Sequence, residues 1–170
     1  MVHPLIEQLR FARSEFVRGL ADVSEDEGIQ RFGPMNSISW TIGHLADQEQ
    51  RYWFQRRALA LPAPGLNDLV GHGKPASTPS IGEMWAAWRA ITEASDPWLD
   101  TLTTSDLLGF FETPGPNESI GTLTQRVIGH YRYHLGEGLA IRQMLGHTDL
   151  PGCRKHRRSS AVPGRAFSRY

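Results

Sequence analysis

Two histidines, His130 and His134, stand four residues apart in the stretch HYRYHLGE near the end of the chain. On an α-helix, residues at positions i and i+4 project side by side from one face, so both imidazole rings can reach one point. Imidazole is a common ligand of zinc, nickel and iron, and this spacing is therefore typical of a metal site. The same pair can also be two polar core residues whose ring nitrogens bond to neighbouring hydroxyls or to each other.

The surrounding residues place this pair within an apolar stripe. At about 100° per residue, the apolar residues within about 60° of His130 are Leu123, Val127, Ile141 and Leu145. Histidines in a buried stripe need partners for their ring nitrogens, whereas histidines on a wet face do not. Glu137, at the edge of the stripe one turn after His134, could accept a hydrogen bond from a ring N–H or complete a ligand set.

A third histidine, His44, lies in the stretch NSISWTIGHLADQEQRYW. On a helix it shares one side with Thr41, Gln48 and Arg51, next to an apolar side. This polar stripe is either solvent-facing surface or the wall of a wet pocket, and periodicity alone does not choose between them. We interpret the remaining histidines, which stand at termini or in expected loops, as surface residues: His3, His72, His147 and His156.

Four segments with helical periodicity must position these residues, and no segment shows sustained strand alternation. They cover about residues 2–22, 37–57, 80–102 and 122–146. The candidate N-caps are Asn36 or Ser37 for the second segment, Ser80 for the third and Thr122 for the fourth. Gly146 is typical of a residue just past a helix end, and we expect Pro97 to kink or interrupt the third helix.

Four amphipathic helices of about 20 residues predict an all-α domain, a four-helix bundle, spanning residues 1–151. The long Pro- and Gly-rich stretch LPAPGLNDLVGHGKPASTPS predicts a crossover loop between the second and third helices. We expect a cytoplasmic protein, since no signal peptide is evident and no apolar run approaches about 18 residues. The single cysteine, Cys153, excludes an internal disulfide.

Charge divides the chain into two parts. Residues 152–170 contain six basic residues and no acidic one, which leaves 12 basic and 18 acidic residues in the first 151. We interpret residues 152–170 as a disordered basic tail. We expect neither a nucleic-acid nor a membrane partner for it, because the folded part offers no matching basic face. We expect a homodimer, since exposed helix faces of a bundle this size often pair.

Both histidine-containing stretches resemble patterns of the DinB-like superfamily, which includes DinB, YfiT and thiol-dependent S-transferases. Residues 40–46, WTIGHLA, are similar to its W-x-x-x-H-L-A pattern. Residues 130–146, HYRYHLGEGLAIRQMLG, are similar to H-x-x-x-H-x-G-[EQ]-x-x-x-[IL]-R-x-x-L-G. The resemblance spans about residues 1–151 in helix order and spacing, and it implies a DinB/YfiT-like four-helix bundle.

The resemblance also implies that His44, His130 and His134 converge on one divalent metal ion and leave coordination positions open. An all-histidine set suits zinc, nickel or iron(II). Relatives that use iron as sulfoxide synthases carry a carboxylate two residues after the second histidine. Gly136 occupies that position here, so we expect zinc or nickel rather than iron.

The function implied by the resemblance is transfer of a low-molecular-weight thiol, such as mycothiol or bacillithiol, to a small-molecule electrophile. We take Glu137 and Arg51 as candidate catalytic residues, and either Arg51 or Arg142 could hold a carboxylate of the thiol or substrate. A metal-dependent hydrolase would use the same three histidines. The non-enzymatic alternative is a stress-related bundle that serves as a dimerisation surface.

Overall fold

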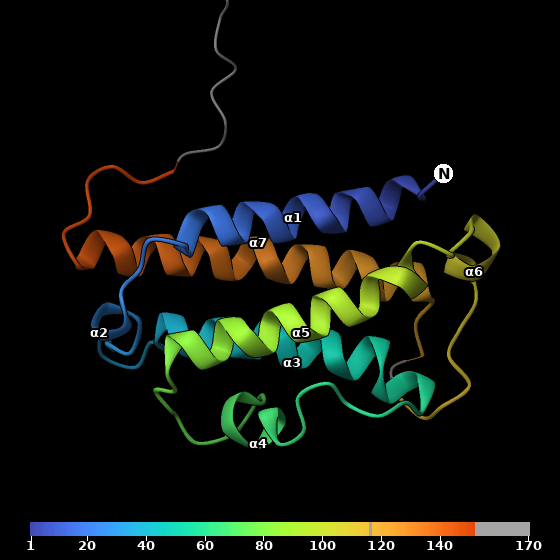
Figure 1. The fold of residues 1–170 in the computed structure, drawn as a ribbon, viewed down its shortest axis with the longest axis horizontal. Coiled ribbons are helices and arrows are strands. Elements are labelled where there is room, and N and C mark those ends of the chain that lie inside the picture. The colour runs from blue at the N-terminus through green and yellow to red at the C-terminus, as the bar shows by residue number, and fades with distance from the viewer. Residues whose placement is uncertain (116, 152–170) are drawn as a thin grey trace, which may run out of the picture.

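The computed structural model describes residues 1–115 and 117–151, and every regular element in these two ranges is helical. The long helices that run alongside one another in Figure 1 are α1 (Pro4–Leu20), α3 (Ile38–Trp53), α5 (Ile81–Leu99) and α7 (Ile120–Met144). The short helices in the connections are α2 (Glu25–Gly28), η1 (Gln55–Arg57), α4 (Leu66–Val70) and α6 (Thr104–Leu108). The all-helical prediction is therefore confirmed.

The long helices share one apolar core. Helix α1 packs along α7, and α3 contacts both α5 and α7 (Figure 1). Each long helix contributes fully buried side chains, among them Phe16, Leu45, Ile91 and Val127. Burying such a side chain stabilises a fold by about 1.5–3 kcal/mol, so this core holds the four helices in fixed relation. Within the described ranges, no helix has the length and apolar character needed to cross a membrane.

Serine side chains start three of the long helices. Ser37, Ser80 and Ser119 each accept a hydrogen bond from the backbone N–H three residues later. The first two caps were predicted, but α7 begins about one turn before the predicted Thr122. The physical reason is that Thr122 supplies the N–H that Ser119 caps, and so lies inside the first turn. At the other end of α7, Gly146 has a φ of 90°, as predicted for a residue just past a helix end.

Two predicted helix ends differ from the structure. Helix α3 stops at Trp53, and a single 3₁₀ turn followed by left-handed Ala58 (φ 54°) covers the rest of the predicted segment. Pro97 lies inside α5, which continues to Leu99 without interruption. Because α5 ends two residues after Pro97, the missing N–H removes a hydrogen bond only from its last turn.

The connection between α3 and α5 is folded onto α3. It contains α4, whose Leu66 and Val70 are buried. The side-chain amide of Gln50 donates to the Ala63 carbonyl (3.0 Å) and accepts from the Ala63 N–H (2.7 Å). The Val70 carbonyl of the same connection bonds to the His44 ring (2.9 Å), so the connection covers part of the α3 side that bears His44.

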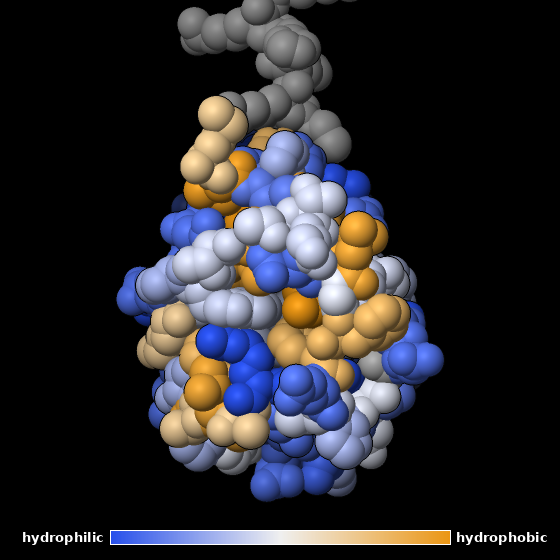
Figure 2. Space-filling view, turned by 90° about the vertical axis from the view of Figure 1, so that its right-hand side faces the viewer, coloured by the Kyte–Doolittle hydropathy of each residue, from blue (hydrophilic) through white to orange (hydrophobic). Residues whose placement is uncertain are grey.

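Figure 2 shows the end of the molecule that carries α6. Hydrophobic residues form several small groups there, separated by hydrophilic ones, and the exposed hydrophobic residues near α6 are Leu108 and Phe110. Scattered exposed apolar residues are normal on a protein surface. The homodimer stays a prediction. The predicted basic tail and Cys153 lie outside the described residues.

Candidate metal centre

Three histidines from two helices meet at one place. His44 on α3 and the pair His130 and His134 on α7 each direct a ring nitrogen to a common point, and these nitrogens lie within 4.8 Å of one another. His44 and His134 are buried, and His130 is half-buried. Ligand atoms this close can share one divalent ion, so the three histidines could bind a metal.

The Nδ1 atom of every ring is held by an oxygen acceptor. The three hydrogen bonds join His44 Nδ1 to the Val70 carbonyl (2.9 Å), His130 Nδ1 to Gln48 Oε1 (2.8 Å) and His134 Nδ1 to Glu137 Oε2 (2.6 Å). Carbonyl, amide and carboxylate oxygens accept and do not donate, so the ring proton sits on Nδ1 in each histidine. Each Nε2 atom is therefore left with its lone pair, which is the form that binds a metal.

The two histidines of α7 approach each other closely. Their Nε2 atoms are only 2.8 Å apart. Because neither Nε2 carries a proton in this arrangement, the contact brings two lone pairs together, which is unfavourable unless a positive charge lies beside them. A divalent ion would turn this repulsion into two coordination bonds. The donor set therefore fits a divalent metal ion.

Burial keeps the three imidazoles neutral. Desolvation lowers the pKa of His44. It lowers the pKa of His130 to about 3, with a further contribution from His134 and His44, and that of His134 to about 4, with a contribution from His44. At neutral pH no proton has to leave these rings before a metal binds.

Two residues of α3 shape the surroundings of His44. The Trp40 ring stacks on the His44 ring with centroids 4.4 Å apart and an angle of 14° between the planes. Gly43 allows close approach of the neighbouring elements, since a Cβ atom there would lie 2.4 Å from Met84 Sδ and 3.2 Å from the Val70 side chain. The stacking fixes the plane of the His44 ring. The missing side chain at Gly43 lets Val70 come close enough to bond to the ring nitrogen.

An open pocket of about 570 Å³ lies over His44 and His130. Its wall also includes Arg51, His72 and Arg126, together with two tyrosines, and none of the described residues that line it is a carboxylate. The two arginines in this wall favour an anionic ligand. The pocket reaches the histidines from one side, and small molecules would approach the centre through it.

The two arginines differ in how far their charge is already matched. Arg126 is held by Glu118 through Nε (3.0 Å) and Nη2. Arg51 donates only its Nε to the buried carboxylate of Asp47 (3.1 Å), which also accepts from Asn67 (2.9 Å). Within the described ranges, the terminal nitrogens of Arg51 have no hydrogen-bond partner. One edge of Arg51 is thus anchored, and the other remains for a ligand.

Of the other residues predicted for the site, two lie at the histidines or the pocket and one lies elsewhere. Arg51 lines the pocket, and Glu137 holds His134 from the Nδ1 side. Of the two alternatives for Glu137, the geometry favours an orienting role over a ligand role. Arg142 lies away from the pocket, contrary to one expectation: it donates to the Gly19 carbonyl and to His147 (3.0 Å), near the C-terminal ends of α1 and α7. Catalytic roles for Arg51 and Glu137 stay predictions.

Sequence reasoning assigned no role to Gln48 or Val70. Gln48 could have been found, because it stands one turn after His44 on the same predicted stripe and faces α7. Val70 acts through its backbone carbonyl, which carries no signature in the sequence. It is placed by the fold of the connection around α4, and only the structure reveals it.

The fold and the site together define a helical protein with a tri-histidine centre that could hold a divalent metal. The chain matches the family model of the DinB superfamily over residues 8–137, a range that includes all three histidines and Glu137. The protein belongs to the DinB superfamily, as the resemblance implied. No curated protein matches the chain.

Proposed function

We propose that this protein is a metal-dependent enzyme that adds a low-molecular-weight thiol to a small electrophile. Its zinc or nickel ligands are His44, His130 and His134, set in a four-helix bundle of the DinB type. The observation that carries the proposal is the 2.8 Å approach of two Nε2 lone pairs whose rings are each fixed from behind. Three protein ligands leave positions open, which is the arrangement of a catalytic rather than a structural metal.

A divalent ion at this centre would lower the pKa of a coordinating thiol, so that a nucleophilic sulfur exists at neutral pH. In the reaction the sulfur lone pair forms a bond to the electrophilic carbon, and the electrons of the broken bond leave with the departing group. The thiol proton passes to water in the open pocket. The chain's own contribution is to hold the three rings and to admit both reactants through the pocket over His44 and His130.

Arg51 supplies the recognition of an anionic group. Its Nε is anchored to buried Asp47, and its outer edge lines the pocket, so it can bind a carboxylate of the thiol with paired hydrogen bonds. Glu137 acts through His134. A carboxylate on Nδ1 fixes the ring and raises its basicity as a ligand, and such contacts are worth about 10–100-fold in metal affinity.

A thiol-conjugation assay tests this function. Zinc-loaded and nickel-loaded protein is incubated with bacillithiol, mycothiol or glutathione and the electrophile 1-chloro-2,4-dinitrobenzene. We expect metal-dependent conjugation with at least one thiol and none for His130→Ala. We expect Arg51→Gln to raise KM for the thiol about 10-fold with little change in kcat, since a charge-assisted hydrogen bond is worth about 1.5–3 kcal/mol.

The matched control is Arg126→Gln, which removes a pocket arginine already held by Glu118 and should change KM much less. Metal-loaded protein that conjugates none of the thiols but hydrolyses esters or amides would contradict thiol transfer. That result would assign the same three ligands to a hydrolase.

A further inference from the structure

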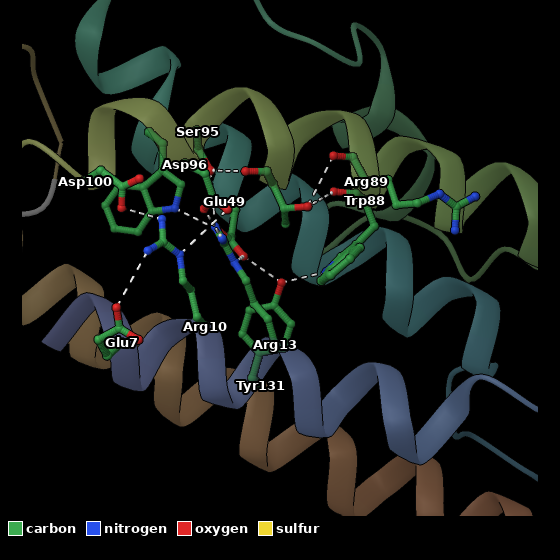
Figure 3. Close-up of polar contacts among 12 residues, drawn as sticks. Glu7, Arg10, Arg13, Glu49, Trp88, Arg89, Ser95, Asp96, Asp100 and Tyr131 are labelled. Carbon is green, nitrogen blue, oxygen red and sulfur yellow. Dashed lines mark hydrogen bonds and ion pairs between the residues drawn. The ribbon is translucent and has the colours of Figure 1, made fainter. Parts of the chain in front are cut away.

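A second buried polar cluster lies beside the histidines, centred on Glu49 of α3 (Figure 3). Glu49 is fully buried. Its carboxylate accepts hydrogen bonds from Arg13 Nε (2.9 Å), Arg13 Nη2, Trp53 Nε1 (2.8 Å) and Tyr131 Oη (2.6 Å). Burial and the Glu49 charge raise the pKa of Tyr131 above its usual range, so its hydroxyl stays a donor.

This Glu49 cluster joins all four long helices (Figure 3). Arg13 of α1 also donates to Asp96 (2.7 Å) and Ser95 (3.2 Å) of α5. Trp88 of α5 donates its Nε1–H to the hydroxyl of Tyr131 on α7 (2.7 Å). The side chain of Tyr131 is thereby held from two helices at once.

Two side-chain hydrogen bonds, made by successive residues of each helix, connect α3 to α7 at the candidate metal centre. Gln48 accepts from the ring of His130, and the next residue, Glu49, accepts from the next residue of α7, Tyr131. Gln48 is one turn after His44, and His134 is one turn after His130. The Glu49–Tyr131 hydrogen bond is therefore adjacent to the Gln48–His130 hydrogen bond, which places a candidate metal ligand.

The Glu49–Tyr131 hydrogen bond limits how far α7 can rotate about its axis. A turn of about 20° would move an atom about 5 Å from the helix axis by about 2 Å. Metal–ligand distances are tolerated within about 0.2 Å, and ligand constellations within about 0.5 Å. Apolar contacts are non-directional, so they specify the rotation of a helix less sharply than a hydrogen bond does. A buried ion pair is in itself weak evidence for stability, whereas it can fix the register of packed helices.

We propose that the Glu49–Tyr131 hydrogen bond is a positioning contact that sets the rotation of α7, so that His130 and His134 meet His44 at metal-binding distance. This inference rests on the metal site of the proposed function but not on thiol transfer. Tyr131 and Glu49 do not touch the metal. They act through His130 and its partner Gln48.

The test compares Tyr131→Phe with Asp96→Asn. The first removes the hydroxyl and keeps the ring. The second weakens the link between α1 and α5 in the same cluster and keeps both hydrogen bonds between α3 and α7. Zinc affinity is measured by competition with a chromophoric chelator, the Co²⁺ absorption spectrum reports ligand geometry, and thermal unfolding of the metal-free protein reports stability.

We expect Tyr131→Phe to weaken zinc binding about 10-fold and to change the Co²⁺ spectrum. Asp96→Asn should leave both unchanged, whatever it does to the melting temperature. If Tyr131→Phe lowers only the melting temperature and binds zinc like the wild type, the cluster is structural and the inference is overturned. A wild-type protein that takes up no metal would overturn the proposed function and this inference together.

A second variant covers the case in which Tyr131→Phe does not fold. Trp88→Phe removes the donor to the Tyr131 hydroxyl and keeps the bond from Tyr131 to Glu49. We expect a smaller loss of zinc affinity, about 3-fold, because Tyr131 is then held from one side only. Zinc binding equal to the wild type in this variant would count against positioning through Tyr131.

Discussion

Two buried polar clusters lie side by side between α3 and α7, and they differ in how their hydrogen bonds are matched. In the Glu49 cluster the acceptor is saturated, since one carboxylate receives four donors. In the histidine cluster the donors are saturated, since every Nδ1–H has an oxygen, but three Nε2 lone pairs converge with no donor between them. The first cluster is complete within the chain, and the second has a surplus of acceptors, which a cation could satisfy.

The clusters also differ in charge. Arg13 supplies the countercharge of Glu49 directly, through two of its nitrogens. The three histidines are neutral, because burial lowers their pKa values. The comparison shows that burial of polar groups by itself does not identify a functional site. The balance of donors, acceptors and charges is what separates the two clusters.

The largest expected effect is the loss of folding stability when the Glu49 cluster is disrupted. Replacing Glu49 by Leu should lower the free energy of unfolding by about 3–5 kcal/mol, because buried Arg13 loses its countercharge. The double variant Arg13→Met/Glu49→Leu should recover most of that loss. His134→Leu in metal-free protein should cost less, since it removes a lone-pair contact. Urea unfolding in the presence of a chelator checks all three. A larger loss for His134→Leu than for Glu49→Leu would reverse the comparison.

A second effect is expected from acidification. The pKa values of His130 and His134 are about 3 and 4 in the folded protein, against about 6.5 when unfolded. As pH falls below 6.5 the unfolded chain binds protons first, so these two groups make the unfolding free energy fall between about pH 6.5 and pH 4. Metal-free wild type should therefore lose melting temperature more steeply over this range than His130→Gln/His134→Gln. Equal slopes would show that the two rings are not kept neutral by burial.

The smallest expected effect is on zinc affinity, when Glu137, the hydrogen-bond partner of His134, is replaced. Glu137→Ala should weaken zinc binding about 10-fold, because the His134 ring loses its Nδ1 acceptor. Glu137→Gln should weaken it less, since an amide oxygen can still accept. Chelator competition measures both, with Glu7→Ala, on the exposed side of α1, as the control. An unchanged affinity in Glu137→Ala would remove Glu137 from the site.

Much of the candidate metal centre could be predicted from the sequence because its signals are local. The spacing of His130 and His134 and the apolar periodicity around them depend on a single helix, and they predict both the pairing and its burial. The capping serines of α3 and α5 are local in the same way. The start of α7 was misplaced because Ser119 and Thr122 are both good caps, and periodicity does not separate residues one turn apart.

The rest depends on contacts between distant parts of the chain. Arg13, Glu49 and Tyr131 come from three helices, and each alone has the pattern of an ordinary polar or amphipathic residue. The Val70 carbonyl reaches His44 only because the connection folds as α4, which the Pro- and Gly-rich sequence did not indicate. Hydrogen-bond balance can be judged only after the tertiary fold has brought such groups together.

Metal content tests the central claim most directly. Untagged protein purified without chelators is analysed by mass spectrometry for transition metals, beside His44→Ala, His130→Ala and the control His72→Ala at the pocket wall. We predict about one zinc or nickel ion per chain in the wild type and in His72→Ala, and its loss in the other two variants. A wild-type protein that is metal-free and takes up neither zinc nor nickel would contradict the claim that these histidines form a metal centre.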